Sequence, residues 1–141
     1  MENKIEKLLL SPYWIIDILP GQVPKDSPGQ YFAVEKYLRE GEQMAAIKQK
    51  HINIILKLNC YREIFLDEET KGNPSPERIA EEMRKRYLYI MADEAMIQSE
   101  PDATYLTVYN PDKNLLDLLT VLASGEGLYV WSSGQGLGIR N

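Results

Sequence analysis

Residues 104–131 restrict the possible folds of this chain more than any other stretch, because three elements can be read in succession. Residues 105–109 (YLTVY) alternate in period two with aromatic and β-branched side chains, which predicts a half-buried strand. Four leucines then recur at helical spacing between residues 115 and 122, and Gly125 and Gly127 end that helix. Residues 128–131 (LYVW) predict a second, short strand. A strand–helix–strand unit of this length fits a right-handed crossover between parallel strands.

Asn110, Pro111 and Asp112 indicate where the helix of this unit begins. Asparagine is a favoured N-cap, proline suits the first helical position, and aspartate suits the positive end of the helix dipole. We therefore expect Asn110 to be the N-cap.

The N-terminal third predicts one helix and two strands. Residues 2–10 fit a short amphipathic helix that Ser11-Pro12 ends. Residues 13–19 are apolar on both faces, which is typical of a central strand or of a dimer surface. After a proline- and glycine-rich loop over residues 20–29, residues 31–38 begin with Tyr-Phe-Ala-Val, and we expect a strand there.

Residues 43–58 carry two competing patterns. Apolar residues fall at helical spacing, yet Ile52, Ile54, Leu56 and Leu58 also alternate in period two. The length without a breaker, two alanines and three lysines favour a helix.

The remaining segments predict a strand at 61–67 and a helix from Pro76 to about Arg86, capped by Ser75. Residues 87–97 and 103–109 then predict an antiparallel pair with Glu100-Pro101-Asp102 in the turn.

These elements predict a single α+β domain over residues 1–141, with helices packed on a mixed β-sheet. The expected order is β-β-α-β-α-β-β-α-β after the short N-terminal helix. Residues 132–141 are glycine-rich and predict a flexible tail.

Composition narrows the classes of function. The net charge of −5 argues against nonspecific binding to nucleic acid or to an anionic membrane, since both need basic surface. Cys60 is the single cysteine, so no intrachain disulfide can form, and we expect a cytoplasmic protein. The sequence lacks dinucleotide, phosphate-loop and zinc-protease motifs, and we expect no cofactor and no metal.

Three residues are candidates for ligand or metal binding. Asp17 interrupts an apolar strand, where a carboxylate could have a raised pKa or bind a metal, or could be held by nearby backbone amides. His51 is the only histidine and lies in the predicted apolar stripe, as a buried base or as a hydrogen-bonded core residue. Glu35 could add a carboxylate, although no spacing selects it.

A second set of candidates suggests protein interaction. Residues 87–112 hold five acidic residues and no lysine or arginine, together with four tyrosines. Tyrosines among carboxylates can form an adhesive surface for a basic partner, or they can be a solvated hairpin whose tyrosines pack in the sheet. The candidates, with two aromatic residues of the apolar strand, are Tyr13, Trp14, Asp93, Glu94, Glu100, Asp102, Tyr105 and Tyr109.

Three hypotheses for function follow. The leading one is a non-catalytic protein-interaction module that binds a protein partner or self-associates, because no catalytic signature is present. The second is a protein or enzyme that binds a small ligand or a metal through carboxylates, with Asp17 first among them. The third is an acidic inhibitor of the immunity type that masks a basic partner, and this analogy is one of charge and size only.

Overall fold

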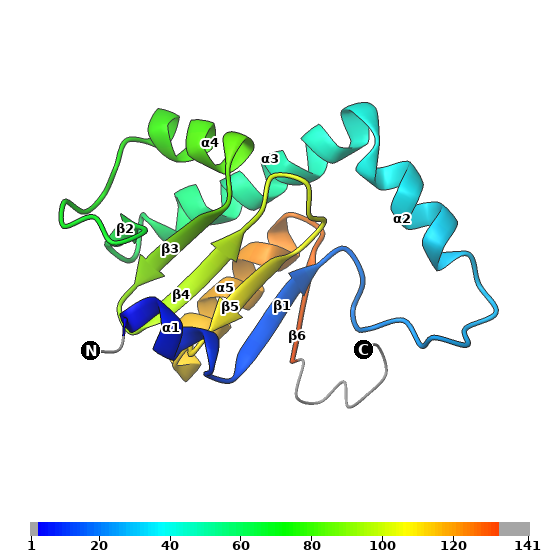
Figure 1. The fold of residues 1–141 in the computed structure, drawn as a ribbon, viewed down its shortest axis with the longest axis horizontal. Coiled ribbons are helices and arrows are strands. Elements are labelled where there is room, and N and C mark those ends of the chain that lie inside the picture. The colour runs from blue at the N-terminus through cyan, green and yellow to red at the C-terminus, as the bar shows by residue number, and fades with distance from the viewer. Residues whose placement is uncertain (1–2, 133–141) are drawn as a thin grey trace.

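The computed structural model describes residues 3–132, which form one open six-stranded sheet and five helices (Figure 1). The order across the sheet is β2-β3-β4-β5-β1-β6, and every neighbouring pair runs antiparallel. The helices are α1 (Lys4–Leu9), α2 (Tyr31–Arg39), α3 (Gly41–Leu58), α4 (Pro76–Lys85) and α5 (Lys113–Gly125). The strands are β1 (Tyr13–Asp17), β2 (Ile64–Leu66), β3 (Leu88–Ala92), β4 (Ala95–Ser99), β5 (Leu106–Tyr109) and β6 (Tyr129–Ser132).

The strand–helix–strand unit expected at the C-terminal end is present as β5, α5 and β6. Both strands run antiparallel to β1, so they are parallel to each other, as a crossover requires. They do not touch, because β1 from the N-terminal part of the chain lies between them. The α+β class with helices packed on one sheet is therefore confirmed, but the sheet contains no parallel neighbours and is not mixed.

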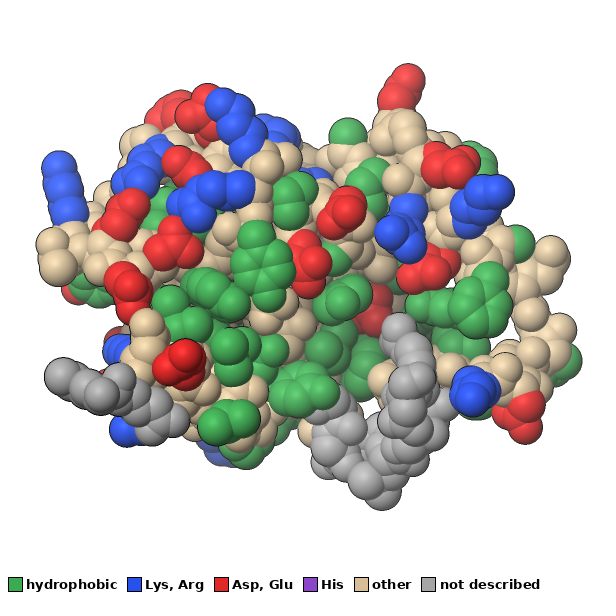
Figure 2. Space-filling model, in the orientation of Figure 1, with side chains coloured by type: hydrophobic (Ala, Val, Ile, Leu, Met, Phe, Trp, Pro, Cys, Tyr) green, Lys and Arg blue, Asp and Glu red, His purple; other side chains and the backbone are tan. Residues whose placement is uncertain are grey.

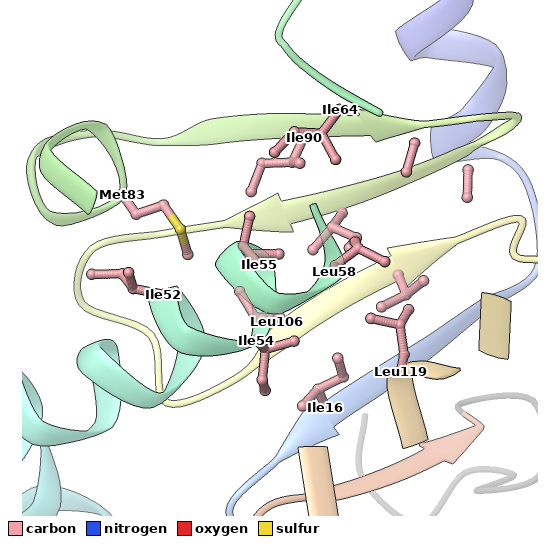
Figure 3. Close-up of a cluster of buried hydrophobic side chains, with 14 of the residues drawn as sticks. Ile16, Ile52, Ile54, Ile55, Leu58, Ile64, Met83, Ile90, Leu106 and Leu119 are labelled. Atoms are coloured by element: carbon pink, nitrogen blue, oxygen red, sulfur yellow. The ribbon is translucent and has the colours of Figure 1, made fainter. Parts of the chain in front are cut away.

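Helices α3, α4 and α5 cover one face of the sheet. Their apolar stripes meet the inward side chains of the strands, and Figure 3 shows Ile55 and Leu58 of α3 among side chains of the sheet such as Ile90 and Leu106. Residues 41–58 form the helix α3, so the helical pattern of residues 43–58 is the correct one. Ile52, Ile54, Ile55 and Leu58 are completely buried. Burying a side chain of this size contributes about 1.5–3 kcal/mol.

Glu126, at the C-terminal end of α5, ties that helix to α3. Its carboxylate accepts hydrogen bonds from Lys57 Nζ at 3.0 Å and from Asn53 Nδ2 at 3.2 Å, and its backbone carbonyl accepts one from Lys50 Nζ at 2.8 Å. The bond from Lys50 satisfies a backbone carbonyl at the helix end that has no partner within the helix.

Among residues 3–132, α1 is the only helix on the opposite face of the sheet. Leu8 of α1 packs on Met91 and Met96, and this small cluster is separate from the main core. In Figure 1 α1 crosses in front of the sheet while α5 lies behind it. We call the side that carries α1 the open face.

The expected strand over residues 31–38 is wrong, because these residues form α2. The segment contacts α3 rather than the sheet, so a strand there would leave its backbone groups unpaired. Tyr31 and Glu35, one turn apart, join through a hydrogen bond of 3.3 Å from the tyrosine hydroxyl to the carboxylate. No residue of α2 is buried, and in Figure 1 this helix projects from the body.

Two local expectations are also corrected. Residues 87–97 are not one strand, because Asp93 and Glu94 form a two-residue turn between β3 and β4, with Asp93 in the left-handed region at φ 55°. Asn110 is likewise left-handed, at φ 59°, and the N-cap of α5 is Asp112, whose Oδ1 accepts from the Leu115 N–H at 2.8 Å. Ser75 caps α4 as expected.

Of the predicted tail, Ser132 belongs to β6, and the rest lies outside the described residues. Within residues 3–132, no helix is long and apolar enough to cross a membrane.

Candidate functional site

The side chains of the open face come from alternate positions on the strands. Register pairs place Tyr13 opposite Tyr109, and Ile15 opposite both Thr107 and Trp131. Tyr89 and Gln98 face each other on β3 and β4. Hydrophobic side chains gather over the centre of this face, with acidic side chains along their border (Figure 2).

A groove of about 550 Å³ lies on the part of the open face formed by β4, β5, β1 and β6. We call it the aromatic groove. It is lined by Leu9, Tyr13, Ile15, Asp17, Gln22, Gln98, Tyr105, Thr107, Tyr109 and Trp131. Its volume falls in the range of about 300–1,000 Å³ that is typical of ligand sites.

The rings of Tyr13 and Tyr109 form one wall of the aromatic groove. Their centroids are 5.5 Å apart and their planes are tilted by 42°. The Tyr109 hydroxyl donates to Gln98 Oε1 at 3.1 Å, and Gln98 Nε2 donates to Glu100 Oε2 at 3.3 Å. This chain of hydrogen bonds fixes the orientation of the Tyr109 ring.

Burial raises the pKa of the Tyr109 hydroxyl, and neighbouring tyrosines and Glu100 raise it further. Tyr109 therefore stays protonated near neutral pH and remains a hydrogen-bond donor.

Asp17 lines the aromatic groove with only 6% of its surface exposed. Its Oδ1 accepts a hydrogen bond of 2.7 Å from the Ile18 backbone N–H. The contact to the Ile18 amide agrees with the interpretation that nearby backbone amides hold Asp17, and binding of a ligand or metal by this carboxylate stays a prediction.

The other two candidate ligands do not join Asp17. Glu35 lies on α2, and His51 lies on α3 against the covered face of the sheet. Among the residues that the structure describes, no three aspartate, glutamate, histidine or cysteine side chains form a group able to hold a metal ion.

His51 lies in a buried polar cluster with Lys48, Ser99 and Thr104, each at most 6% exposed. Lys48 Nζ donates to Ser99 Oγ at 3.1 Å. Burial lowers the pKa of Lys48 to about 8, against the attraction of Glu100 and Asp102. Burial, with the charge of Lys48, lowers the pKa of His51 to about 3.

Neither ring nitrogen of His51 makes a hydrogen bond of normal geometry, although the backbone of Thr104 is near enough to oppose part of that pKa shift. His51 is thus a core residue, as one interpretation expected, but without the firm hydrogen bond that usually accompanies burial.

Cys60 lies exposed beyond the end of α3. It is nine residues from His51, which corresponds to about 13 Å along a helix.

The acidic span is divided between the two ends of β4. Asp93 and Glu94 form the turn before this strand, whereas Glu100 and Asp102 follow it, about 20 Å away at the rise of a strand. Asp93 forms an ion pair with Arg62. Within residues 3–132, Glu94, Glu100 and Asp102 form no ion pair with a lysine or arginine.

A second groove, of about 360 Å³, lies on the other side of α1. We call it the acidic groove. Its lining consists of Lys4, Ile5, Glu63, Phe65, Asp67, Glu68, Glu69, Met91 and Asp93. Arg86, Arg78 and Arg62 pair with Asp67, Glu69 and Asp93 from outside the lining.

Of the predicted interaction residues, Tyr13, Tyr105 and Tyr109 do come together in the aromatic groove. Trp14 does not, because it points to the covered face opposite Val108. Trp131 and Gln98 were not singled out from the sequence, although Trp131 lies in a segment predicted as a strand and Gln98 directly follows one. Their places in the groove depend on the pairing of β6 with β1 and of β4 with β5, and local sequence does not reveal this strand order.

Comparison with protein-family models, with curated proteins and with solved structures finds no match for this chain. Its function therefore has to be inferred from the geometry of the open face.

Proposed function

We propose that this chain is a non-catalytic interaction module whose open face binds a protein partner. The observation that supports this most directly is the aromatic groove, with four aromatic side chains on the sheet face where α1 is the only helix among residues 3–132. Tyrosine and tryptophan are enriched where protein interfaces concentrate their binding energy. An apolar face rimmed by polar groups is a feature of interaction surfaces.

The lining of the aromatic groove fits binding better than catalysis. In the described part of the chain it holds one carboxylate and no imidazole, thiol or amine. Lys48 and His51, whose pKa values are strongly lowered, are buried on α3 at the other face of the sheet. General acid–base catalysis needs such a group within hydrogen-bond reach of the substrate.

A quantitative pull-down tests this proposal. Wild-type protein is compared with Tyr13→Ser/Tyr109→Ser and with Tyr61→Ser, which alters an exposed tyrosine outside the groove. We expect a specific partner to be retained by the wild type and by Tyr61→Ser, and to be lost from the double variant. A partner whose retention ignores the groove tyrosines contradicts the proposal.

Self-association is the second form that this function can take. Sedimentation at micromolar concentration measures it, and the same double variant shows whether the open face carries it. A dimer that Tyr13→Ser/Tyr109→Ser dissociates would make the partner a second copy of the chain.

One observation favours a second candidate function, the binding of a small ligand through a carboxylate. Asp17 lies nearly buried in a groove of ligand size. A specific ligand raises the melting temperature by mass action. Screening divalent cations and metabolite mixtures by thermal unfolding, with Asp17→Asn as the control, measures this directly, and a shift that persists in Asp17→Asn excludes Asp17 as the binding group.

A further inference from the structure

We infer that the aromatic groove receives a basic side chain, arginine or lysine, from the partner protein. This inference rests on the proposed function and adds the chemistry of the group that is bound. It follows from the combination of rings and carboxylate in the lining and from the charge around the groove.

The lining has the composition of a site for an organic cation. Tyr13, Tyr105, Tyr109 and Trp131 present aromatic rings, and the faces of such rings attract ammonium and guanidinium groups. Asp17 adds a carboxylate in the same groove, and arginine pairs with carboxylates through two parallel hydrogen bonds. Gln98 and Thr107 supply further oxygen acceptors.

The surroundings of the groove are negative. In the part of the chain that the structure describes, no lysine or arginine lines the aromatic groove. Glu100 stands at its border, bonded to Gln98 and without an ion-pair partner among residues 3–132. Across α1, the acidic groove adds Glu63 and Glu68, which form no ion pair among residues 3–132, whereas its other three carboxylates are paired with arginines. Such a surface steers basic partners towards it.

The same charge argues against the other occupants. A second copy that docked through the same face would oppose these carboxylates to themselves, because a two-fold interface brings identical patches together. An anionic partner would meet the same repulsion. The observations therefore favour a different protein that presents a basic segment.

Two tryptophans provide an internal control for the test. Trp131 lines the aromatic groove, whereas Trp14 lies on the covered face of the sheet. The full chain, labelled with ¹⁵N, is titrated with a short arginine-containing peptide and with the same peptide carrying citrulline, which keeps the shape but removes the charge. We expect the arginine peptide to shift the indole signal of Trp131 and to leave that of Trp14 in place. We expect the citrulline peptide to bind about tenfold or more weakly.

Variants identify the groups that bind. Asp17→Asn and Tyr105→Leu should each weaken binding of the arginine peptide about tenfold, and Tyr61→Leu should not change it. Because Asp17 is nearly buried, its variant risks misfolding, and Glu100→Gln at the border provides a second test through the salt dependence of binding.

Several outcomes overturn the inference. These are equal binding of the citrulline peptide, a shift of Trp14 without one of Trp131, and a dimer that depends on Tyr109. Binding of N-acetylarginine amide as tightly as the peptide would instead assign the groove to a free small ligand.

The experiments also separate this inference from the proposed function. A partner that requires Tyr13 and Tyr109 but ignores Asp17, Glu100 and salt leaves the interaction module in place and removes the cation site. Binding of the arginine peptide without any partner that depends on the groove tyrosines does the reverse.

Discussion

His51 is a neutral base enclosed in the core, and this determines how the protein responds to acid. It lies one helical turn from Lys48, so a proton on its ring would add a second positive charge to a buried site that Lys48 already occupies. Ser99 supplies one hydroxyl to Lys48, and Glu100 and Asp102 act from the loop after β4. These contacts favour the neutral imidazole.

The free energy of unfolding should therefore fall as the solution is acidified. The folded pKa of about 3 lies below the ordinary value of 6.5, so the unfolded chain takes up a proton that the folded chain refuses between these two values. Stability is full above about pH 6.5 and is lost progressively towards pH 3. Between pH 7 and pH 5 the loss from this residue is about 2 kcal/mol.

Urea unfolding at several pH values measures this effect. In His51→Gln, which cannot titrate, that part of the pH dependence should disappear even though the variant is itself less stable. An unchanged slope in His51→Gln would show that His51 is not the titrating group.

At the scale of single elements, the start of α5 is difficult to locate from sequence, because three consecutive residues are each favourable near a helix N-terminus. Asn110, Pro111 and Asp112 each fit a helix start, and only the backbone angles distinguish them. Asn110 takes a left-handed conformation that asparagine tolerates, and its Nδ2 donates to the Glu94 carbonyl at 3.0 Å.

Asp112→Ala should therefore cost about 1 kcal/mol of stability by removing the cap, and Asp112→Ser should retain most of it. Asn110→Gly should cost less, because glycine adopts the left-handed conformation freely. Chemical denaturation of the three variants decides between the two caps, and a larger loss in Asn110→Gly than in Asp112→Ala would restore Asn110 as the cap.

Helix α2 is the element least involved in the core. Its large apolar side chains Phe32, Val34 and Tyr37 are 76%, 52% and 62% exposed. Truncating an exposed side chain removes few contacts, so Phe32→Ser/Tyr37→Ser should change the free energy of unfolding by no more than about 0.5 kcal/mol. Ile47→Ser, in the neighbouring α3, should cost more than about 2 kcal/mol because Ile47 is buried. A loss above about 1 kcal/mol in the α2 variant would mean that this helix stabilises the body.

At the scale of the whole molecule, the two faces of the sheet differ in how the helices cover them. Helices α3, α4 and α5 bury one face, and in the described part of the chain α1 is the only helix on the open face. Two adjacent isoleucines of β1 lie on opposite faces of the sheet. Ile16 is fully buried in the main core, and Ile15 lines the aromatic groove.

Ile16→Ala should cost about 3–4 kcal/mol, because it leaves a cavity in the core. Ile15→Ala should cost clearly less, about 1–2 kcal/mol, because part of the Ile15 side chain borders the open groove and not packed protein atoms. Thermal or urea unfolding of this pair measures the difference, and equal losses would argue that the open face is packed as tightly as the core.

Some parts of the structure were predictable from local pattern. The apolar stripe of α3, the Ser75 cap of α4 and the alternation in β5 follow from the geometry of a single helix or strand. Local pattern does not predict the turn at Asp93 and Glu94, because Asp-Glu lacks the glycine that marks most two-residue hairpins. The aromatic and β-branched residues at 31–34 favour a strand locally, but a strand also needs neighbouring strands, which local sequence does not specify.

The sequence by itself determined which segments are helices and strands where the periodicity was long, together with the acidic balance and the lack of catalytic motifs. It did not determine that β1 separates β5 from β6, nor that Trp131 and Asp17 share a groove while His51 lies on the other side of the sheet. Those features depend on pairing between residues far apart in the chain. Local periodicity indicates only that a strand has two faces, and tertiary packing decides which of them the helices cover.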